Sequence, residues 1–335
     1  MGLADSMELA ASAGLNYAEN GAPGYRRIRR GRGFSYLDPR GNPVNGRKRE
    51  SFAALAIPPA WTDVWISADP SSHIQATGYD DAGRKQYIYH PDWEAARDEV
   101  KFERMGDFGA HIGRLRRRVE ADLRQPGMPR RKVIALAVAL LDQTLIRVGN
   151  RKYADENEAY GLTTLTCDHV TVRGSRVQLD FSGKGGADHQ LVVEDARLAR
   201  LVAKCRGLGG DTLLSYQNGV GLGVTSSTDV NDYLAETMGG PFTAKDFRTW
   251  GASTAVTEFL AGEARSEIES EILAAIDATA EKLGNTREVC RDSYVHPSIP
   301  DAYREGSLRE AWVRSRSGRW LTRPESTVNR LLRGT

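Results

Sequence analysis

The character of the sequence changes after His90-Pro91, and this change limits the architectures open to the chain. Before it, residues 25–90 form short segments bounded by Gly, Pro, Asp and Asn, which is typical of β-strands. After it, residues 93–123 are charged and helix-like. We therefore expect an α+β protein with a small β-rich N-terminal domain over residues 1–96. A larger, mainly α catalytic domain that holds a small β-sheet is expected over residues 97–335.

The clearest β signal in the N-terminal part is a hairpin. Ile74–Tyr79 leads into the glycine-containing turn Asp80–Gly83, and Arg84–Tyr89 follows. Because the second segment alternates, Tyr87 and Tyr89 should lie on one face. The other elements expected here are two strands and a short helix, over residues 34–37, 64–66 and 6–13.

The strongest helical pattern begins after Met128-Pro129. Apolar residues recur at the spacing of one helix face from Arg130 to about Val148. From Asp195 onward the pattern is again helical, interrupted by Gly- and Pro-rich breaks. Between these helical stretches the sequence predicts short strands, over residues 163–165, 169–172, 177–181 and 189–193.

Charge and cysteine content narrow the function classes only a little. The net charge is +2, but nine Arg or Lys lie between Tyr25 and Glu50, and arginine recurs from Asp301 onward. Clustered arginine fits phosphate binding, although a solvated basic surface has the same pattern. The three cysteines have neither metal-site nor disulfide spacing, and no run reaches the ~18 apolar residues of a membrane helix. We expect a cytoplasmic protein with no membrane partner, metal or cofactor.

Five side chains of the larger domain form a chemically suggestive set. They are Arg147, Lys184, Arg248, Asn285 and Tyr294. A tyrosine can attack a phosphodiester, arginines can hold the phosphate, and a lysine can protonate the leaving oxygen. Glycines on both sides of the lysine predict a hairpin tip. Each residue also has an ordinary interpretation, such as a packing tyrosine, a turn lysine or, for the asparagine, a helix N-cap whose capping box is completed by Glu288.

Several runs spread between residues 25 and 300 carry a family resemblance. They are Ile57–Trp61, Ala76–Asp80, Gly83–Tyr87, Ile146–Gly149, Glu156–Leu165, Gly183-Lys184, Lys245–Gly251 and Gly284–Tyr294. Together they resemble the type IB DNA topoisomerases of the small poxviral and bacterial kind. The first three runs and Glu156–Leu165 are the most specific, whereas Gly183-Lys184 would be weak alone.

The resemblance implies a monomer that clamps duplex DNA, with the N-terminal sheet on one side and the catalytic domain on the other. It implies catalytic roles for Arg147, Lys184, Arg248 and Tyr294. Asn285 stands where most viral relatives carry histidine, and its amide can still donate to a phosphate oxygen. The DNA-contacting positions that it implies are Arg84, Gln86, Tyr87, Tyr89 and Tyr153.

The expected activity is that of a type I DNA topoisomerase, an isomerase of the bacterial cytoplasm and nucleoid. A transient 3′-phosphotyrosyl link to one strand lets the free end swivel, and religation needs neither ATP nor metal. The alternative is a tyrosine site-specific recombinase, which shares the catalytic set. Recombinases usually carry His-x-x-Arg at the second arginine, where this chain has Lys245–Arg248, and their N-terminal domains tend to be helical. A DNA-binding protein that has lost its chemistry would not need so complete a set.

Overall fold

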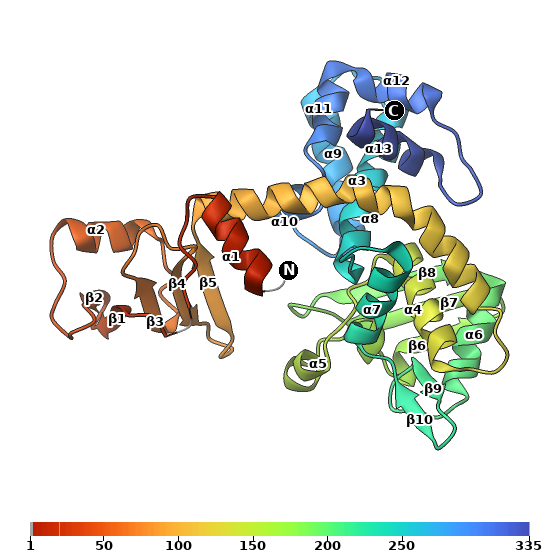
Figure 1. Cartoon of the computed structure of the whole chain (residues 1–335), viewed down its shortest axis with the longest axis horizontal. Coiled ribbons are helices and arrows are strands. Elements are labelled where there is room, and N and C mark those ends of the chain that lie inside the picture. The colour runs from red at the N-terminus through yellow and green to blue at the C-terminus, as the bar shows by residue number, and fades with distance from the viewer. Residues whose placement is uncertain (1–2, 20, 335) are drawn as a thin grey trace. The chain divides into compact units, whose positions relative to one another are not determined.

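The computed structural model describes residues 3–19 and 21–334, and internal contacts divide the chain into two compact units (Figure 1). One unit ends at Lys101 and the other begins at Phe102. The long helix α3, Pro91–Asp122, carries the chain from the first unit into the second. The domain division expected between residues 96 and 97 falls within this helix and stays a prediction. The α+β class predicted from the sequence is confirmed.

The N-terminal unit is built on a five-stranded antiparallel sheet in the order β2-β1-β3-β4-β5. Its elements are α1 (Leu3–Ser12), β1 (Gly24–Arg30), β2 (Gly33–Leu37), α2 (Arg47–Ala54), β3 (Thr62–Ser67), β4 (Ile74–Tyr79) and β5 (Lys85–Tyr89). Phe52 of α2 packs into the core with Tyr36, Val64 and Ile66 of the strands. The hairpin predicted over residues 74–89 is confirmed, and Asp80 and Gly83 form its turn.

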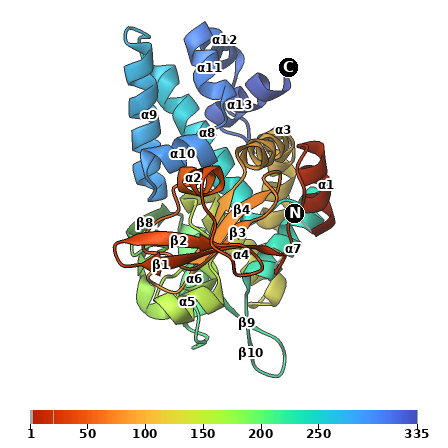
Figure 2. The same cartoon turned by 90° about the vertical axis from the view of Figure 1, so that its left-hand side faces the viewer.

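The C-terminal unit contains the C-terminal part of α3, most of the helices and two further small sheets. The elements after α3 are α4 (Arg130–Thr144), α5 (Arg151–Asn157), β6 (Val170–Arg173), β7 (Arg176–Ser182), β8 (Asp188–Glu194), α6 (Ala196–Arg206), β9 (Ser215–Gln217), β10 (Leu222–Val224), α7 (Ser227–Met238), α8 (Ala244–Gly262), α9 (Ile268–Leu283), α10 (Arg287–Ser293), α11 (Ser298–Glu305), α12 (Ser307–Arg314) and α13 (Arg323–Arg333). Within this unit, α9 and α11–α13 gather at one end, and α4, α6 and the β6-β7-β8 sheet lie at the other, with α8 between (Figures 1 and 2).

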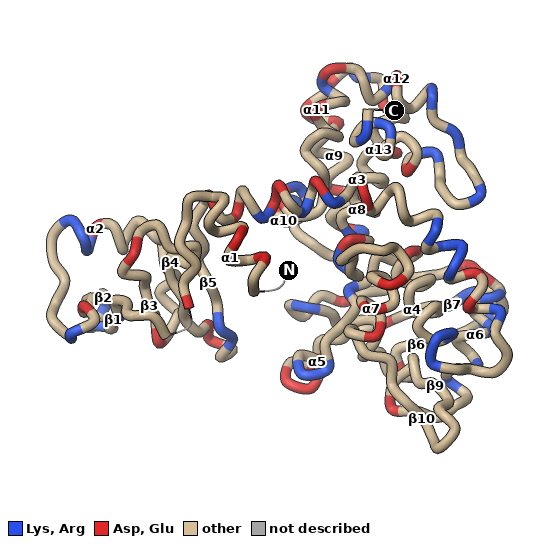
Figure 3. The backbone as a smooth tube through the Cα atoms, viewed as in Figure 1, with Lys and Arg blue, Asp and Glu red and all other residues tan. Residues whose placement is uncertain are grey.

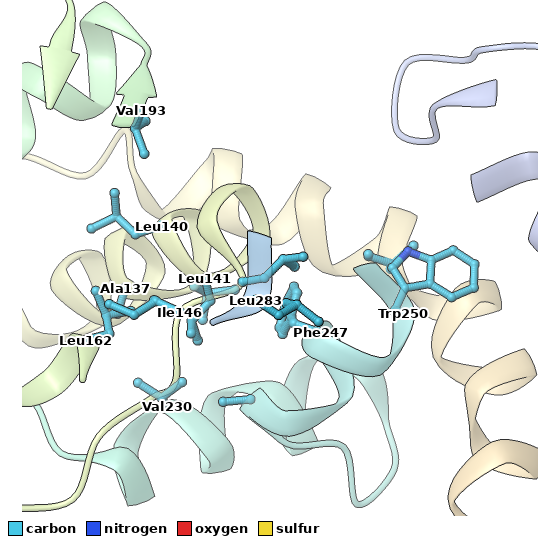
Figure 4. Close-up of a cluster of buried hydrophobic side chains, with 14 of the residues drawn as sticks. Ala137, Leu140, Leu141, Ile146, Leu162, Val193, Val230, Phe247, Trp250 and Leu283 are labelled. Atoms are coloured by element: carbon cyan, nitrogen blue, oxygen red, sulfur yellow. The ribbon is translucent and has the colours of Figure 1, made fainter. Parts of the chain in front are cut away.

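The core of the C-terminal unit is organised around α4. Its run Val133–Leu141 is apolar throughout, and nearly every side chain of this run is buried. Leucines of α4 meet Phe247 of α8 and Leu283 of α9 in one cluster (Figure 4). Shortening one such leucine to alanine costs about 2–5 kcal/mol. The core therefore fixes the C-terminal ends of α4 and α9 and the N-terminal half of α8.

Three local predictions for this unit are wrong. α4 ends at Thr144 instead of near Val148, because Leu145 adopts a left-handed conformation with φ 55°. Residues 162–164 form a 3₁₀ turn where a strand was expected, and Thr164 Oγ1 accepts a hydrogen bond from the Gly161 N–H. The region after Asp195 is not wholly helical, since β9 and β10 pair as a hairpin.

Candidate active site

Arg248 lies at the centre of the candidate site, and the ends of two helices hold it. Its Nη1 donates to the carbonyl oxygen of Leu145 at 2.7 Å, and its Nη2 donates to that of Leu283 at 3.0 Å. The side chain is buried, and its Nε has no hydrogen-bond partner among the residues that the structure describes. The guanidinium is therefore fixed in place while one of its donors remains unsatisfied.

Tyr294 follows α10 and packs against Arg248. The guanidinium carbon lies 4.8 Å from the centre of the tyrosine ring, and Tyr294 is 9% exposed. The buried Ser253, on the same helix as Arg248, donates to the Tyr294 carbonyl at 3.3 Å and accepts from the His296 N–H at 2.9 Å. Helix α8 thus positions both the arginine and the backbone of the tyrosine.

Arg147 and Asn285 form a second contact within the site. Arg147 Nη2 donates to Asn285 Oδ1 at 2.7 Å. Because arginine can only donate, this contact orients the amide and leaves its NH2 group to face elsewhere. Asn285 Nδ2 is buried and has no partner in the described part of the chain. The site therefore holds two buried, unsatisfied donors, one on Asn285 and one on Arg248.

The predicted capping role of Asn285 is wrong. The N-cap of α10 is Thr286, whose hydroxyl accepts from the Val289 N–H. The Asn285 N–H instead bonds to the Ala280 carbonyl, just after Gly284 ends α9 in a left-handed conformation. The asparagine side chain is thus free of helix capping and available to the site.

Lys184 lies in the loop between β7 and β8, as the glycine pattern predicted. The turn is closed by a Gly183–Ala187 backbone hydrogen bond of 2.7 Å, and Gly185 and Gly186 have positive φ. Lys184 is exposed and lines a cavity of about 420 Å³ together with Arg147. A smaller pocket is lined by Lys184, Arg147 and Arg248. Through these pockets and contacts, the structure brings all five predicted catalytic residues into one region.

The charges of this region act on the phenol. Burial favours a higher pKa for Tyr294, but Arg248, Arg147 and Lys245 act in the opposite direction. Their combined effect leaves the pKa of Tyr294 below its usual value of 10.0. Burial also lowers the pKa of the Arg248 guanidinium, although the phenol opposes this. Arginine nevertheless remains charged near neutral pH.

Four of the five predicted DNA-contacting residues share the β4–β5 hairpin of the N-terminal unit. Arg84 Nε and Gln86 Nε2 each donate to Asp80 Oδ2 at 2.8 Å. The rings of Tyr87 and Tyr89 stack 5.8 Å apart at 8°, so the predicted common face is confirmed. The fifth residue, Tyr153, belongs to α5 of the C-terminal unit and lines the cavity that contains Lys184.

Two residues of the site were missed from the sequence. Lys245 lies one helical turn before Arg248 and contributes to lowering the pKa of Tyr294. Its spacing of three residues, which places both side chains on one helix face, could have identified it. His189 lines the small pocket with Arg147 and Arg248. Its position in an alternating strand carries no signal of this role.

The described residues contain neither a candidate metal site nor a candidate membrane-spanning helix. Within residues 3–19 and 21–334, no group of three or more His, Cys, Asp or Glu side chains is arranged to hold a metal ion. None of the helices in the same ranges combines the length and apolar character needed to cross a membrane.

Comparison with known proteins places this site in a family. The model described as eukaryotic DNA topoisomerase I, catalytic core, matches residues 90–306, and that of the bacterial DNA topoisomerase IB N-terminal domain matches residues 33–80. DNA topoisomerase 1B of Acanthamoeba polyphaga mimivirus is 32% identical over 274 residues, which cover 78% of this chain and 81% of the viral protein.

More distant relatives match shorter stretches. DNA topoisomerase 1 beta of Arabidopsis thaliana is 31% identical over 179 residues, 50% of this chain and 18% of the plant protein. DNA topoisomerase 1B of Vaccinia virus (strain Copenhagen) is 26% identical over 161 residues, 45% of this chain and 50% of the viral protein. The matched catalytic core spans most of the C-terminal unit, including the region where the predicted residues converge. The chain therefore belongs to the type IB DNA topoisomerases.

Proposed function

We propose that this topoisomerase relaxes supercoiled duplex DNA by cutting and resealing one strand, with Tyr294 as the nucleophile. The observation that carries the proposal is the pair of buried donors without acceptors, Arg248 Nε and Asn285 Nδ2, in the region of Tyr294. A buried donor that lacks an acceptor costs about 1–3 kcal/mol. Such donors beside two guanidiniums favour an anion with several oxygens, and a DNA phosphodiester supplies them.

The reaction follows from the chemistry of these residues. The Tyr294 phenolate attacks the phosphorus, a new O–P bond forms, and the bond to the 5′ oxygen breaks. Arg147, Arg248 and the Asn285 amide stabilise the extra negative charge on the nonbridging oxygens. Lys184 gives its proton to the leaving 5′ oxygen. Religation reverses each step, because the 5′ hydroxyl attacks the phosphotyrosyl bond and returns its proton to Lys184.

Positive charges take the place of a dedicated base in this proposal. A free tyrosine has a pKa near 10 and is almost fully protonated at neutral pH. The lowered pKa of Tyr294, caused by Arg248, Arg147 and Lys245 against the effect of burial, increases the phenolate fraction. The phosphotyrosyl bond conserves the energy of the original bond, so that resealing requires no ATP.

We propose further that the protein acts as a monomer, with the N-terminal domain and the catalytic domain clamping the duplex and the division near residues 96 and 97. Figure 3 shows basic positions at the start of α2, and nine Lys or Arg lie between Tyr25 and Glu50. These charges should bind phosphates, while Arg84, Gln86, Tyr87, Tyr89 and Tyr153 make further contacts with DNA. Such an enzyme would work at the nucleoid in the cytoplasm.

Plasmid relaxation tests the proposal. The wild-type protein should relax positive and negative supercoils with EDTA present and ATP absent, and should leave a covalent protein–DNA band on a denaturing gel. Tyr294→Phe should bind duplex DNA but form neither relaxed product nor covalent band. A strict requirement for magnesium or ATP, or a covalent band from Tyr294→Phe, would contradict the proposal. A recombinase would instead exchange strands between two specific sites.

A further inference from the structure

The imidazole of His189 fills the space between two glycines that are distant in the sequence. A Cβ atom on Gly183 would lie 2.5 Å from His189 Cδ2, and one on Gly284 would lie 2.4 Å from His189 Cε1. Gly183 directly precedes Lys184, and Gly284 directly precedes Asn285. One ring therefore touches both the loop that carries the lysine and the end of the helix that precedes the asparagine.

The sheet holds this ring from its other side. His189 on β8 pairs directly with Phe181 on β7, and the two rings stack 5.0 Å apart at 20°. Among the described residues, none hydrogen-bonds to the imidazole nitrogens. The ring is thus fixed by packing between Phe181 and the two glycines. It acts as a spacer, because it keeps these segments apart by its size and not by hydrogen bonds.

The charges around His189 favour the neutral ring. Burial lowers the pKa of His189, Arg147 and Arg248 lower it further, and Asp188 opposes them. Lys184 and Lys282 line the same pocket. A protonated imidazole would face several cations here, and their repulsion favours the neutral ring.

We infer that His189 is a positioning residue for Lys184. The neutral ring, seated against Gly284, sets how deeply the Lys184 loop enters the site beside Arg147 and Asn285. The chain has no histidine at position 285, yet it keeps an imidazole next to this position, supplied by the β-hairpin. The inference rests on the proposed function, because it assumes that Lys184 delivers a proton to the leaving oxygen.

Single-turnover cleavage with two DNA substrates tests the inference. One substrate has an ordinary scissile phosphodiester, and the other has sulfur at the 5′-bridging position, whose thiolate leaves without a proton. His189→Ala should cleave ordinary DNA on the order of 10- to 100-fold more slowly, which is what a misplaced catalytic group costs. It should regain most of its rate on the sulfur substrate. His189→Phe keeps a planar ring and should stay within a few-fold of wild type on both.

Gly183→Ala gives a second test that does not depend on how well His189→Ala folds. Gly183 does not have a positive φ, and the ring of His189 makes the closest contacts to the added methyl group. Gly183→Ala should therefore slow cleavage of ordinary DNA by displacing the ring. Combining it with His189→Ala should give a rate no lower than that of His189→Ala alone, because the methyl then meets no imidazole.

Lys184→Ala, measured beside these variants, separates the acid role of Lys184 from the positioning role of His189. If sulfur fails to rescue Lys184→Ala, the lysine is not the acid, and both the proposed mechanism and the role of His189 are refuted. If sulfur rescues Lys184→Ala but not His189→Ala, only the positioning role is refuted. That role is also refuted if His189→Ala cleaves ordinary DNA at the wild-type rate. A His189→Phe variant as slow as His189→Ala would show that a ring nitrogen is required, which contradicts a spacer.

Discussion

At the scale of single residues, the site is a group of cations around a buried phenol. If the phenolate is the nucleophile, the cleavage rate rises with pH as Tyr294 loses its proton, and the pKa that sets this rising limb lies below 10.0. Lys245→Gln removes one of the charges that hold this pKa down. The rising limb of its pH profile should therefore move to higher pH. Single-turnover cleavage from about pH 6 to about pH 10 measures this, because it follows the rate up to the ordinary pKa of tyrosine.

Lys282→Gln is the matched control for this prediction. Lys282 lines the small pocket beside Arg147, but it is not among the groups with the largest effects on the pKa of Tyr294. Its pH profile should coincide with that of the wild type. Equal shifts in both variants would mean that general charge, and not the position of Lys245, sets the profile.

Asn285 should act as a neutral donor to the phosphate. Asn285→Ala removes the buried Nδ2 donor and should raise the cleavage barrier by about 1–3 kcal/mol, whereas Asn285→His should keep much of the activity. The control is Thr286→Ala, which removes the actual N-cap of α10 and should lower the melting temperature more than the cleavage rate. If Asn285→Ala cleaves DNA at the normal rate but has a lowered melting temperature, Asn285 stabilises the fold and does not act in cleavage.

The five catalytic candidates could be predicted from the sequence, because their residue types and their order along the chain are distinctive. The order Arg, Lys, Arg, Asn, Tyr predicted five side chains that the structure brings into one region. His189 could not be predicted in this way, because its role depends on contacts with Gly183 and Gly284. Those contacts exist only once the β7–β8 hairpin and the end of α9 have come together.

At the scale of elements, helix α13 is tied to α8 by one buried carboxylate. Glu325 is 5% exposed, accepts from Trp250 Nε1 at 3.0 Å and pairs with Arg116 of α3 at 2.6 Å. Glu325→Ala would leave the Arg116 charge only partly paired and the Trp250 N–H without this acceptor. We expect a loss of about 3–5 kcal/mol in the free energy of unfolding, measured by denaturant titration.

Glu269→Ala provides the comparison for this loss. Glu269 also pairs with an arginine, Arg304 at 2.7 Å, but its side chain is 66% exposed. Removing a solvent-exposed pair should cost much less, because water screens the two charges. If both variants lose the same free energy of unfolding, the buried Glu325 carboxylate contributes no more to stability than an exposed ion pair.

Element boundaries were predicted less well than element types, and the reasons are local. The periodic pattern of α4 continues past Thr144, but the left-handed Leu145 ends the helix. This turn presents the Leu145 carbonyl to Arg248. Residues 163–165 look like a strand because they are rich in threonine, yet their N–H groups bond to the loop after α4 and within their own turn. In both places long-range contacts override the local pattern.

At the scale of the whole molecule, the two units should contribute separable parts of the activity. Arg147 belongs to the C-terminal unit and touches Asn285, so its loss should act on the chemical step. Arg147→Ala should raise the cleavage barrier by about 3 to 4 kcal/mol, the cost of a lost oxyanion donor. Gln86 and Tyr87 belong to the β4–β5 hairpin of the N-terminal unit. There Gln86 donates to Asp80, and the ring of Tyr87 stacks on that of Tyr89.

Gln86→Ala or Tyr87→Ala should therefore weaken binding or change the choice of cleavage site, and leave the rate at saturating DNA nearly unchanged. Measuring the dissociation constant and the single-turnover rate for each variant separates the two effects. Binding should weaken as salt rises in every variant, because phosphate contacts dominate the affinity. If the N-terminal variants lower the saturated rate as much as Arg147→Ala does, the hairpin acts in the chemical step. A division of work between a binding unit and a catalytic unit would then be wrong.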